Sequence, residues 1–299
     1  MESSGAGSLS IIRSTPNDDA GAGFEIYIAI DASGQVFAYN GHVDLGTGIR
    51  TALTQIVAEE LDVALDRVTM VLGDTTKTPN QGPTIASETI QITAVPLRNA
   101  AAQARHYLLA RAAERLGQPL DSLSIEDGLI RAQNNHSVSY AELVAGNTVR
   151  LELRDDVALK DVNSYKLVGR AIPRLEIPAM TTGEMIYVHD VRVPGMLHGR
   201  VVRPPYAGVD AGDFVGTSLI AVDESSVADI PGLIAVVRIG DFVGVVTDRE
   251  ENAIRAAAQL RLTWRPTPTL PDLKDIATAL RANPSTPRVL RDTGGVDDA

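Results

Sequence analysis

The chain has 299 residues with 27 Lys and Arg against 38 Asp and Glu, and its net charge of −11 argues against a nucleic-acid-binding surface. Hydrophobic residues make up 44% and charged residues 22%, as in a soluble globular protein rather than a disordered one. The absence of cysteine excludes disulfides, a thiolate nucleophile, and zinc or iron–sulfur sites ligated by Cys of this chain.

The N-terminal part of the chain predicts a flexible start followed by a hairpin. Residues 1–22 are rich in Gly, Ser and Asp, so we expect a flexible N-terminus. Alternating apolar residues predict a strand over 24–30, with a return strand over 36–43. Helical spacing then predicts a helix over 51–62, and a short buried strand follows over 68–72.

A long helix is predicted over 87–116, with Gly117 as its C-cap and Pro96 as a kink or interruption. Short strands and a small helix are expected over 123–153. The charged run that follows places a domain boundary near residue 160.

The second half predicts a smaller α+β unit of about one hundred residues. Its expected elements are strand-like structure at 162–169, strands at 185–188, 197–202, 219–222, 233–237, 242–246 and 262–264, and a helix at 249–260. A Pro-rich extension with one helix over 270–280 closes the chain and is expected to contact a partner. The sequence thus predicts four segments: a flexible N-terminus (1–22), a first domain (23–160), a second domain (161–266) and the Pro-rich extension (267–299). The predicted fold class is α+β.

A Gly-Thr-Gly turn stands where the second strand gives way to the first helix. Gly46 and Gly48 flank Thr47, and glycines at a helix N-terminus allow backbone N–H groups to approach a phosphate or the polar edge of a pterin. The turn lacks the Lys-Ser/Thr of a P-loop and the third Rossmann glycine. A β-to-α turn that needs glycine for its backbone geometry is the alternative.

A second polar segment precedes the long helix. Thr84, Ser87 and Thr89 offer hydroxyls, and the start of a helix offers free N–H groups. Ser87 as an ordinary N-cap is the alternative.

Taken together, the two segments resemble the molybdopterin-binding subunit of the xanthine dehydrogenase/aldehyde oxidase family. The likeness is strongest to the isoquinoline 1-oxidoreductase and nicotinate dehydrogenase type. It rests on residues 41–61, Gly73-Asp74-Thr75, Thr78-Pro79 and Thr84 to Ser87. Residues 167–205 resemble the hammerhead domain that follows in this family, in particular Gly183-Glu184, Tyr187 to Asp190 and Pro194 to Pro205. In all, the likeness covers residues 24–265 and implies a partial molybdopterin-binding domain followed by a hammerhead-like domain.

The resemblance implies contacts to a molybdopterin cytosine dinucleotide through backbone amides and hydroxyls. The matching positions are Gly46, Thr47, Gly48, Thr84, Ala86, Ser87 and Gln91. Thr47 stands where the wider family commonly has Gln, and Met180 stands where relatives usually carry Lys.

The resemblance also implies what other chains must supply. The family's general-base Glu lies in a Gly-Glu-Pro-like motif that this sequence lacks, so no catalytic residue is expected here. Glu59, Glu60 and Glu88 match helix-surface or capping positions better. The expected partners are a second molybdenum-subunit chain that carries this Glu and a small subunit that carries the 2Fe–2S clusters. A flavin or cytochrome subunit is a further candidate.

The sequence therefore predicts one subunit of a heteromeric molybdenum hydroxylase. The enzyme would oxidise an N-heteroaromatic compound or an aldehyde with oxygen from water, and pass electrons to its iron–sulfur partner. The alternative is a scaffold subunit that binds partners and no cofactor. No secretory signal and no membrane span are recognised, so a cytoplasmic location is expected, with partner-mediated export left open.

Overall fold

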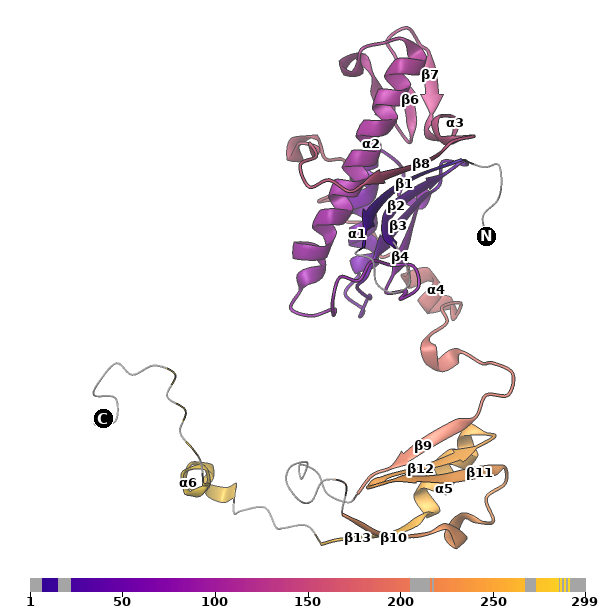
Figure 1. The fold of residues 1–299 in the computed structure, drawn as a ribbon, viewed down its shortest axis with the longest axis vertical. Coiled ribbons are helices and arrows are strands. Elements are labelled where there is room, and N and C mark those ends of the chain that lie inside the picture. Colours follow the sequence, from indigo (N-terminus) through magenta and orange to yellow (C-terminus); the bar gives the residue numbers. More distant parts are fainter. Residues whose placement is uncertain are drawn as a thin grey trace, which may run out of the picture. The chain divides into compact units, whose positions relative to one another are not determined.

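The chain divides into two compact units, Met1–Ile186 and Tyr187–Ala299 (Figure 1). The computed structural model describes residues 7–15, 23–204, 216, 218–266, 273–284, 286, 288 and 290. The division lies after the boundary predicted near 160. Residues 160–176 attach to the first unit through hydrogen bonds to its first helix.

A five-stranded sheet forms the centre of the first unit, in the order β4-β3-β2-β1-β8. The inner pairs β1–β2 and β2–β3 are antiparallel, whereas β3–β4 and β1–β8 are parallel. Parallel neighbours need a crossover, and α1 supplies it between β3 and β4. The strands are β1 (Ser8–Ser14), β2 (Phe24–Asp31), β3 (Val36–Asn40), β4 (Val68–Leu72) and β8 (Thr148–Glu152).

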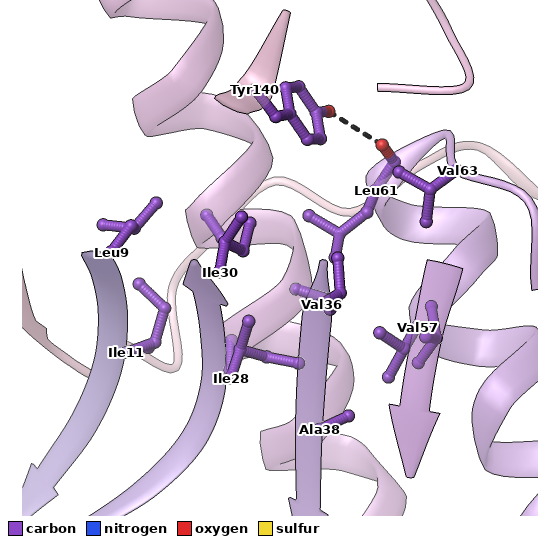
Figure 2. Close-up of a cluster of buried hydrophobic side chains, with 14 of the residues drawn as sticks. Leu9, Ile11, Ile28, Ile30, Val36, Ala38, Val57, Leu61, Val63 and Tyr140 are labelled. Carbon is purple, nitrogen blue, oxygen red and sulfur yellow. Dashed lines mark hydrogen bonds between the residues drawn. The ribbon is translucent and has the colours of Figure 1, made fainter. Parts of the chain in front are cut away.

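Two helices, α1 (Ile49–Leu61) and α2 (Ala94–Leu116), lie against the sheet (Figure 1). The core between them is formed by alternate strand residues, among them Ile28 and Ile30, with Val57 and Leu61 of α1 (Figure 2). Small residues such as Ala100 and Ala104 are fully buried on α2 and permit close packing. The predicted hairpin, helix and buried strand of this region are confirmed.

The predicted flexible N-terminus is wrong for residues 8–14. They form β1, which pairs with β2 on one side and with β8 on the other. Leu9 and Ile11 are 1% and 0% exposed. Residues 1–6 and 16–22 lie outside the described part of the chain.

The predicted long helix is confirmed, since helical structure runs without a break from Glu88 to Leu116. A single π-helical turn, η2 (Thr89–Thr93), precedes α2, and Pro96 falls within the first turn of α2. The N–H of Ala94 bonds to the carbonyl oxygen of Thr89, five residues back, so the helix is irregular just before Pro96, where the sequence predicts a kink or interruption. Gly117 ends α2 with φ 62°, as predicted.

A small three-stranded sheet and a capped helix follow α2, in agreement with the predicted short elements. The strands are β5 (Ser124–Glu126), β6 (Leu129–Arg131) and β7 (Ser137–Ser139), and the helix is α3 (Tyr140–Val144). The strand-like structure predicted over 162–169 is wrong: a 3₁₀ turn, η4 (Val162–Ser164), precedes an irregular segment. A short helix, α4 (Ile177–Thr182), ends this unit.

The second unit holds the sheets β11-β12-β9 and β10-β13, with α5 packed beside β9 and β12. Val227, Val243 and Val245 are fully buried in its core. The strand predicted at 185–188 is wrong, because a 3₁₀ turn, η5, lies at Val188–Asp190. The helix predicted at 270–280 is described as η8 (Leu273–Asp275) and α6 (Ile276–Ala282). The other elements are β9 (His198–Val202), β10 (Leu219–Asp223), β11 (Leu233–Ile239), β12 (Phe242–Thr247), α5 (Glu250–Gln259) and β13 (Arg261–Trp264).

The α+β fold class is thus confirmed in both units. Among the described residues, no helix is long and apolar enough to cross a membrane.

Candidate functional site

The structure brings the two polar loops together around one open pocket of about 340 Å³ in the first unit. One loop joins β3 to α1, and the other precedes η2. Thr47 comes from the first loop, and Thr84, Ala86 and Ser87 come from the second. The pocket is completed by Leu45, Ile49, Ile85, Thr89 and Ile90.

The lining combines free hydroxyls with exposed apolar side chains. Within the described part of the chain, no hydrogen bond engages the hydroxyl of Thr47 or Ser87. Leu45 and Ile85 are 69% and 56% exposed. A ligand in this pocket would therefore meet a mainly apolar wall with a few hydroxyl donors and acceptors, which is a common composition for binding sites of organic molecules.

The backbone of the second loop is held in an uncommon conformation. Ala86 and Ser87 have φ values of 49° and 58°. Two consecutive non-glycine residues in the left-handed region cost about 1–3 kcal/mol each, and such strain is typical of ligand-binding loops. Ser87 is not the N-cap of the following helix, since neither η2 nor α2 has a side-chain cap.

The amides of the Gly-Thr-Gly turn face an internal acceptor instead of the pocket. The carboxylate of Asp44 accepts the N–H groups of Gly46 at 2.9 Å, Gly48 at 3.2 Å and Arg50 at 3.1 Å. Asp44 therefore caps the N-terminus of α1 from outside the helix and neutralises its dipole. The amides of Gly46 and Gly48 therefore donate to Asp44 and not into the pocket in this structure.

The same contacts explain how the Asp44 carboxylate titrates. Partial burial alone would raise the pKa of Asp44, but the N–H groups of Arg50, Gly46, Gly48 and Thr47 outweigh it and lower the pKa below 3.8. Asp44 therefore stays charged at neutral pH, and its negative charge beside the turn disfavours a phosphate at the helix N-terminus.

Thr84 and Gln91 lie in different places. The Thr84 hydroxyl accepts the N–H of Val43 at 3.0 Å and so links the second loop to the first loop, which follows β3. Gln91 lines a separate pocket of about 490 Å³ together with Tyr27 and Asn80. The predicted site residues are thus brought together around Thr47 and Ser87, whereas Gln91 is not among them.

His42 supports this pocket and was not among the site residues predicted from the sequence. His42 is fully buried, and its Nδ1 lies 2.8 Å from the hydroxyl of Thr89, which lines the pocket. Its Nε2 lies 3.4 Å from the carbonyl oxygen of Gln81. A buried imidazole that bridges the two loops fixes their separation, and only its position four residues before Gly46 could have indicated this role.

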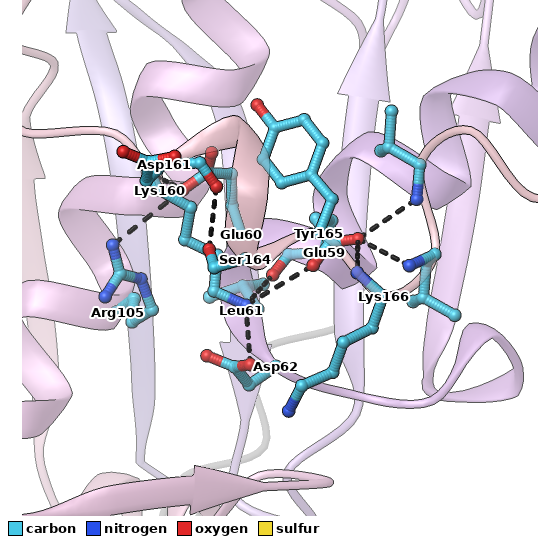
Figure 3. A network of polar contacts seen from close by, with 12 residues as sticks. Glu59, Glu60, Leu61, Asp62, Arg105, Lys160, Asp161, Ser164, Tyr165 and Lys166 are labelled. Atoms are coloured by element: carbon cyan, nitrogen blue, oxygen red, sulfur yellow. Dashed lines mark hydrogen bonds and ion pairs between the residues drawn. The ribbon is translucent and has the colours of Figure 1, made fainter.

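Glu59 and Glu60 are not on the helix surface, contrary to the prediction. They are 2% and 1% exposed, and they lie in a polar cluster with Lys160 and Arg105 (Figure 3). No group of three or more His, Cys, Asp or Glu side chains in the described ranges could hold a metal ion. The pocket between the two loops is thus the best candidate for a cofactor, and its lining contains no carboxylate.

Comparison with known proteins gives one matching family and several longer relatives. The sequence model of the molybdopterin cofactor-binding domain matches residues 2–186. The chain is 61% identical over 273 residues to a nicotinate dehydrogenase subunit from Pseudomonas putida, and 31% identical over 284 residues to the beta subunit of isoquinoline 1-oxidoreductase from Brevundimonas diminuta. A solved CO dehydrogenase from Oligotropha carboxidovorans matches 46% of this chain and 18% of its own, at 21% identity and a TM-score of 0.36.

The chain is much shorter than the curated relatives it matches. The alignments cover 91% and 81% of this chain but only 23% and 35% of the two relatives. The family match ends at residue 186, where the first compact unit also ends. The chain belongs to the molybdopterin cofactor-binding domain family, within the xanthine dehydrogenase family.

Proposed function

We propose that the first unit forms one wall of the cofactor site in a molybdenum-dependent dehydrogenase or hydroxylase. The observation that carries the proposal is the pocket between the two loops, with Thr47 and Ser87 presenting unpartnered hydroxyls to it. The family match to a molybdopterin cofactor-binding domain supports the same conclusion.

The residues present fit a large polar cofactor in a specific way. The hydroxyls of Thr47 and Ser87 can each donate and accept one hydrogen bond, which suits the heteroatom edge of a pterin. The exposed apolar side chains Ile85 and Ile90 offer a surface for the flat face of a ring system. The Gly46 and Gly48 amides contribute to the shape of the loop and not to direct binding, because they donate to Asp44.

When bound, a molybdenum cofactor supplies the redox centre for oxidising an organic substrate with oxygen from water. In the proposed arrangement this chain binds and orients that group and excludes water from one side. The pocket lining offers no carboxylate for a general base, so we propose that this base comes from a region or chain beyond the residues described.

The names of the relatives suggest a substrate class. Their names identify a nicotinate dehydrogenase and an isoquinoline oxidoreductase, and both substrates are N-heteroaromatic rings. We therefore propose an N-heteroaromatic substrate before an aldehyde, a cytosine dinucleotide form of the cofactor, and 2Fe–2S clusters on a partner that accepts the electrons.

Cofactor content of the assembled protein tests this proposal. Thr47→Val with Ser87→Ala removes both free hydroxyls at nearly constant volume. We expect molybdenum and pterin per mole of purified complex to fall about tenfold, since each lost hydrogen bond to a buried ligand costs about 1 kcal/mol or more. The readouts are metal analysis and pterin fluorescence after oxidation.

The matched control is Thr148→Val with Ser137→Ala, which changes the same residue types at exposed strand positions of the same unit. This control should retain its cofactor. If the wild-type complex carries neither molybdenum nor pterin, the cofactor proposal fails and the scaffold alternative takes its place. Full cofactor content in the double variant would show that the pocket has been assigned wrongly.

A further inference from the structure

One side of α1 is polar and yet buried, because an irregular segment lies across it. Thr51, Gln55 and Glu59 are spaced four residues apart and therefore share one face of the helix. All three bind backbone groups of residues 160–176, which we name the strap. The opposite face, with Leu53, Val57 and Leu61, packs in the core.

The contacts of this face follow the strap from end to end. Glu59 Oε2 accepts three consecutive N–H groups, those of Lys166 at 2.9 Å, Leu167 at 2.6 Å and Val168 at 3.0 Å. Gln55 Nε2 donates to the carbonyl oxygens of Leu167 at 2.9 Å and Arg170 at 3.2 Å.

The two ends of the strap are also attached to α1. The Thr51 hydroxyl accepts the N–H of Leu175 at 2.9 Å, close to the start of the helix. At the other end, Lys160 donates its N–H to Glu60 and its ammonium group to Asp62 at 2.5 Å (Figure 3). Because these partners are side chains on one rigid helix, the register of the strap along α1 is fixed.

One side chain of the strap, that of Arg174, contacts the Gly-Thr-Gly turn. Arg174 donates from Nη1 to the carbonyl oxygen of Gly46 at 3.0 Å. A Cβ at Gly48 would lie 3.3 Å from Cδ of Arg174, so the aliphatic part of Arg174 lies against this residue. The guanidinium is held at the same time by Glu176, through Nε at 2.7 Å and through Nη2.

The Glu176 carboxylate of this ion pair is expensive to bury. The Glu176 side chain is 9% exposed, and its Oε2 has no partner in the described part of the chain. A buried carboxylate with an unsatisfied oxygen is a weak source of stability and is better explained by a demand for fixed geometry. The geometry that it fixes here is that of the guanidinium beneath the turn.

We propose that Arg174 is a positioning residue, set by the strap, that fixes the conformation of the Gly46–Gly48 turn beside the pocket. Arg174 holds the carbonyl side of the turn, and Asp44 holds its amide side. Thr47, at the apex, is thereby presented to the pocket. As a statement about a cofactor site, the inference rests on the proposed function.

Amide hydrogen exchange in the full chain, without cofactor, tests this coupling directly. Arg174→Gln removes the positive charge and the guanidinium N–H donors and retains much of the aliphatic part of the side chain. We expect the amides of Gly46 and Gly48 to exchange about tenfold faster, because the turn loses the contact that keeps them on Asp44. Amides of β2 and β3 should keep their rates, which a general loss of stability would not allow.

Two further variants sharpen the result. Arg170→Gln alters another arginine of the strap whose side chain is exposed, and the turn should exchange as in the wild type. Gln55→Leu removes the middle attachment of the strap without touching the turn, and we expect about threefold faster exchange at Gly46 and Gly48. If both Arg174→Gln and Gln55→Leu leave these rates within twofold of the wild type, the inference is wrong.

A second measurement separates this inference from the proposed function. In the assembled complex, Arg174→Gln should lower molybdenum and pterin content about fivefold while Arg170→Gln leaves it unchanged, since a loosened loop binds its ligand less well. Faster exchange in a chain whose wild-type complex lacks molybdenum would uphold the strap and overturn the cofactor assignment. If exchange is unchanged in Arg174→Gln and the wild-type complex does carry molybdenum, the cofactor assignment is upheld and the role of Arg174 is overturned.

Discussion

Glu59 shows how a single carboxylate can hold an irregular segment in place. Its side chain is 2% exposed and accepts three consecutive backbone N–H groups. Burial alone would raise the pKa of Glu59, but the N–H groups of Leu167, Val168 and Lys166 and the charge of Lys160 together lower it below 4.5. The carboxylate is therefore charged in the folded protein at neutral pH.

Glu59→Gln should lower the free energy of unfolding of the first unit by about 2–4 kcal/mol at pH 7, because a neutral amide oxygen replaces a charged acceptor of three donors. The pKa is lower in the folded state, so the stabilisation is present above pH 4.5 and lost as the pH falls through the folded-state pKa. The difference between variant and wild type should therefore shrink in acid. Urea unfolding at a series of pH values measures it.

The control for this prediction is Glu114→Gln on α2, where the carboxylate is 66% exposed and pairs with the exposed Arg111. An exposed pair of this kind contributes less than about 1 kcal/mol. A pH-independent loss in Glu59→Gln, or an equal loss in both variants, would contradict the assigned role.

At the scale of elements, β1 determines whether the first unit can form its sheet. It pairs with β2, only a short distance away in sequence, and with β8, which lies more than 130 residues further along. Ile11 is fully buried between the sheet and the helices. The strand is therefore a central part of the sheet and not a dispensable extension.

Ile11→Ala should cost about 2–5 kcal/mol, as expected for a large-to-small change in a packed core. Ile12, the next residue on the same strand, points to the other face and is only partly buried. Ile12→Ala should therefore cost about 1 kcal/mol. Thermal and urea unfolding of the two variants gives the comparison, and equal losses would mean that β1 is not packed as described.

The contrast between β1 and its neighbours shows what the sequence can predict. Alternation over 24–31 marks β2 because the pattern is local and long enough to recognise. The stretch 8–14 is short and lies within a polar, glycine-rich context, and its partner β8 is remote in sequence. The polar–apolar alternation within the strand covers only Ser8 to Ile11 and is broken at Ile12, which is why the prediction of a flexible N-terminus is wrong there.

The same distinction applies to the candidate site. The residue types at Thr47 and Ser87 predict a hydroxyl-bearing pair of loops, and the structure places both at one pocket. The sequence could not show that Asp44 would take the amides of the turn, because the side-chain geometry decides it. Nor could it place Arg174 beneath the turn, since the strap that carries it has no regular pattern.

For the whole molecule, the position of the strap decides where the first unit ends. Buried residues form two clusters that share no member: one lies within 9–144 and the other within 219–260. The strap follows the first cluster in sequence, and it supplies the partners of Glu59, Gln55 and Thr51. A cut before the strap and a cut after it should therefore have very different effects.

A fragment of residues 1–186 should fold by itself, with a Tm for the first unit within about 3 °C of that in the full chain, because both the core and the strap are retained. A fragment of residues 1–160 should be strongly destabilised, since it loses the three N–H groups that Glu59 accepts and Leu167, which packs against the core. Circular dichroism and calorimetry on the two fragments measure this. If the 1–160 fragment melts like the 1–186 fragment, the strap is not part of the first unit and the division after residue 186 is wrong.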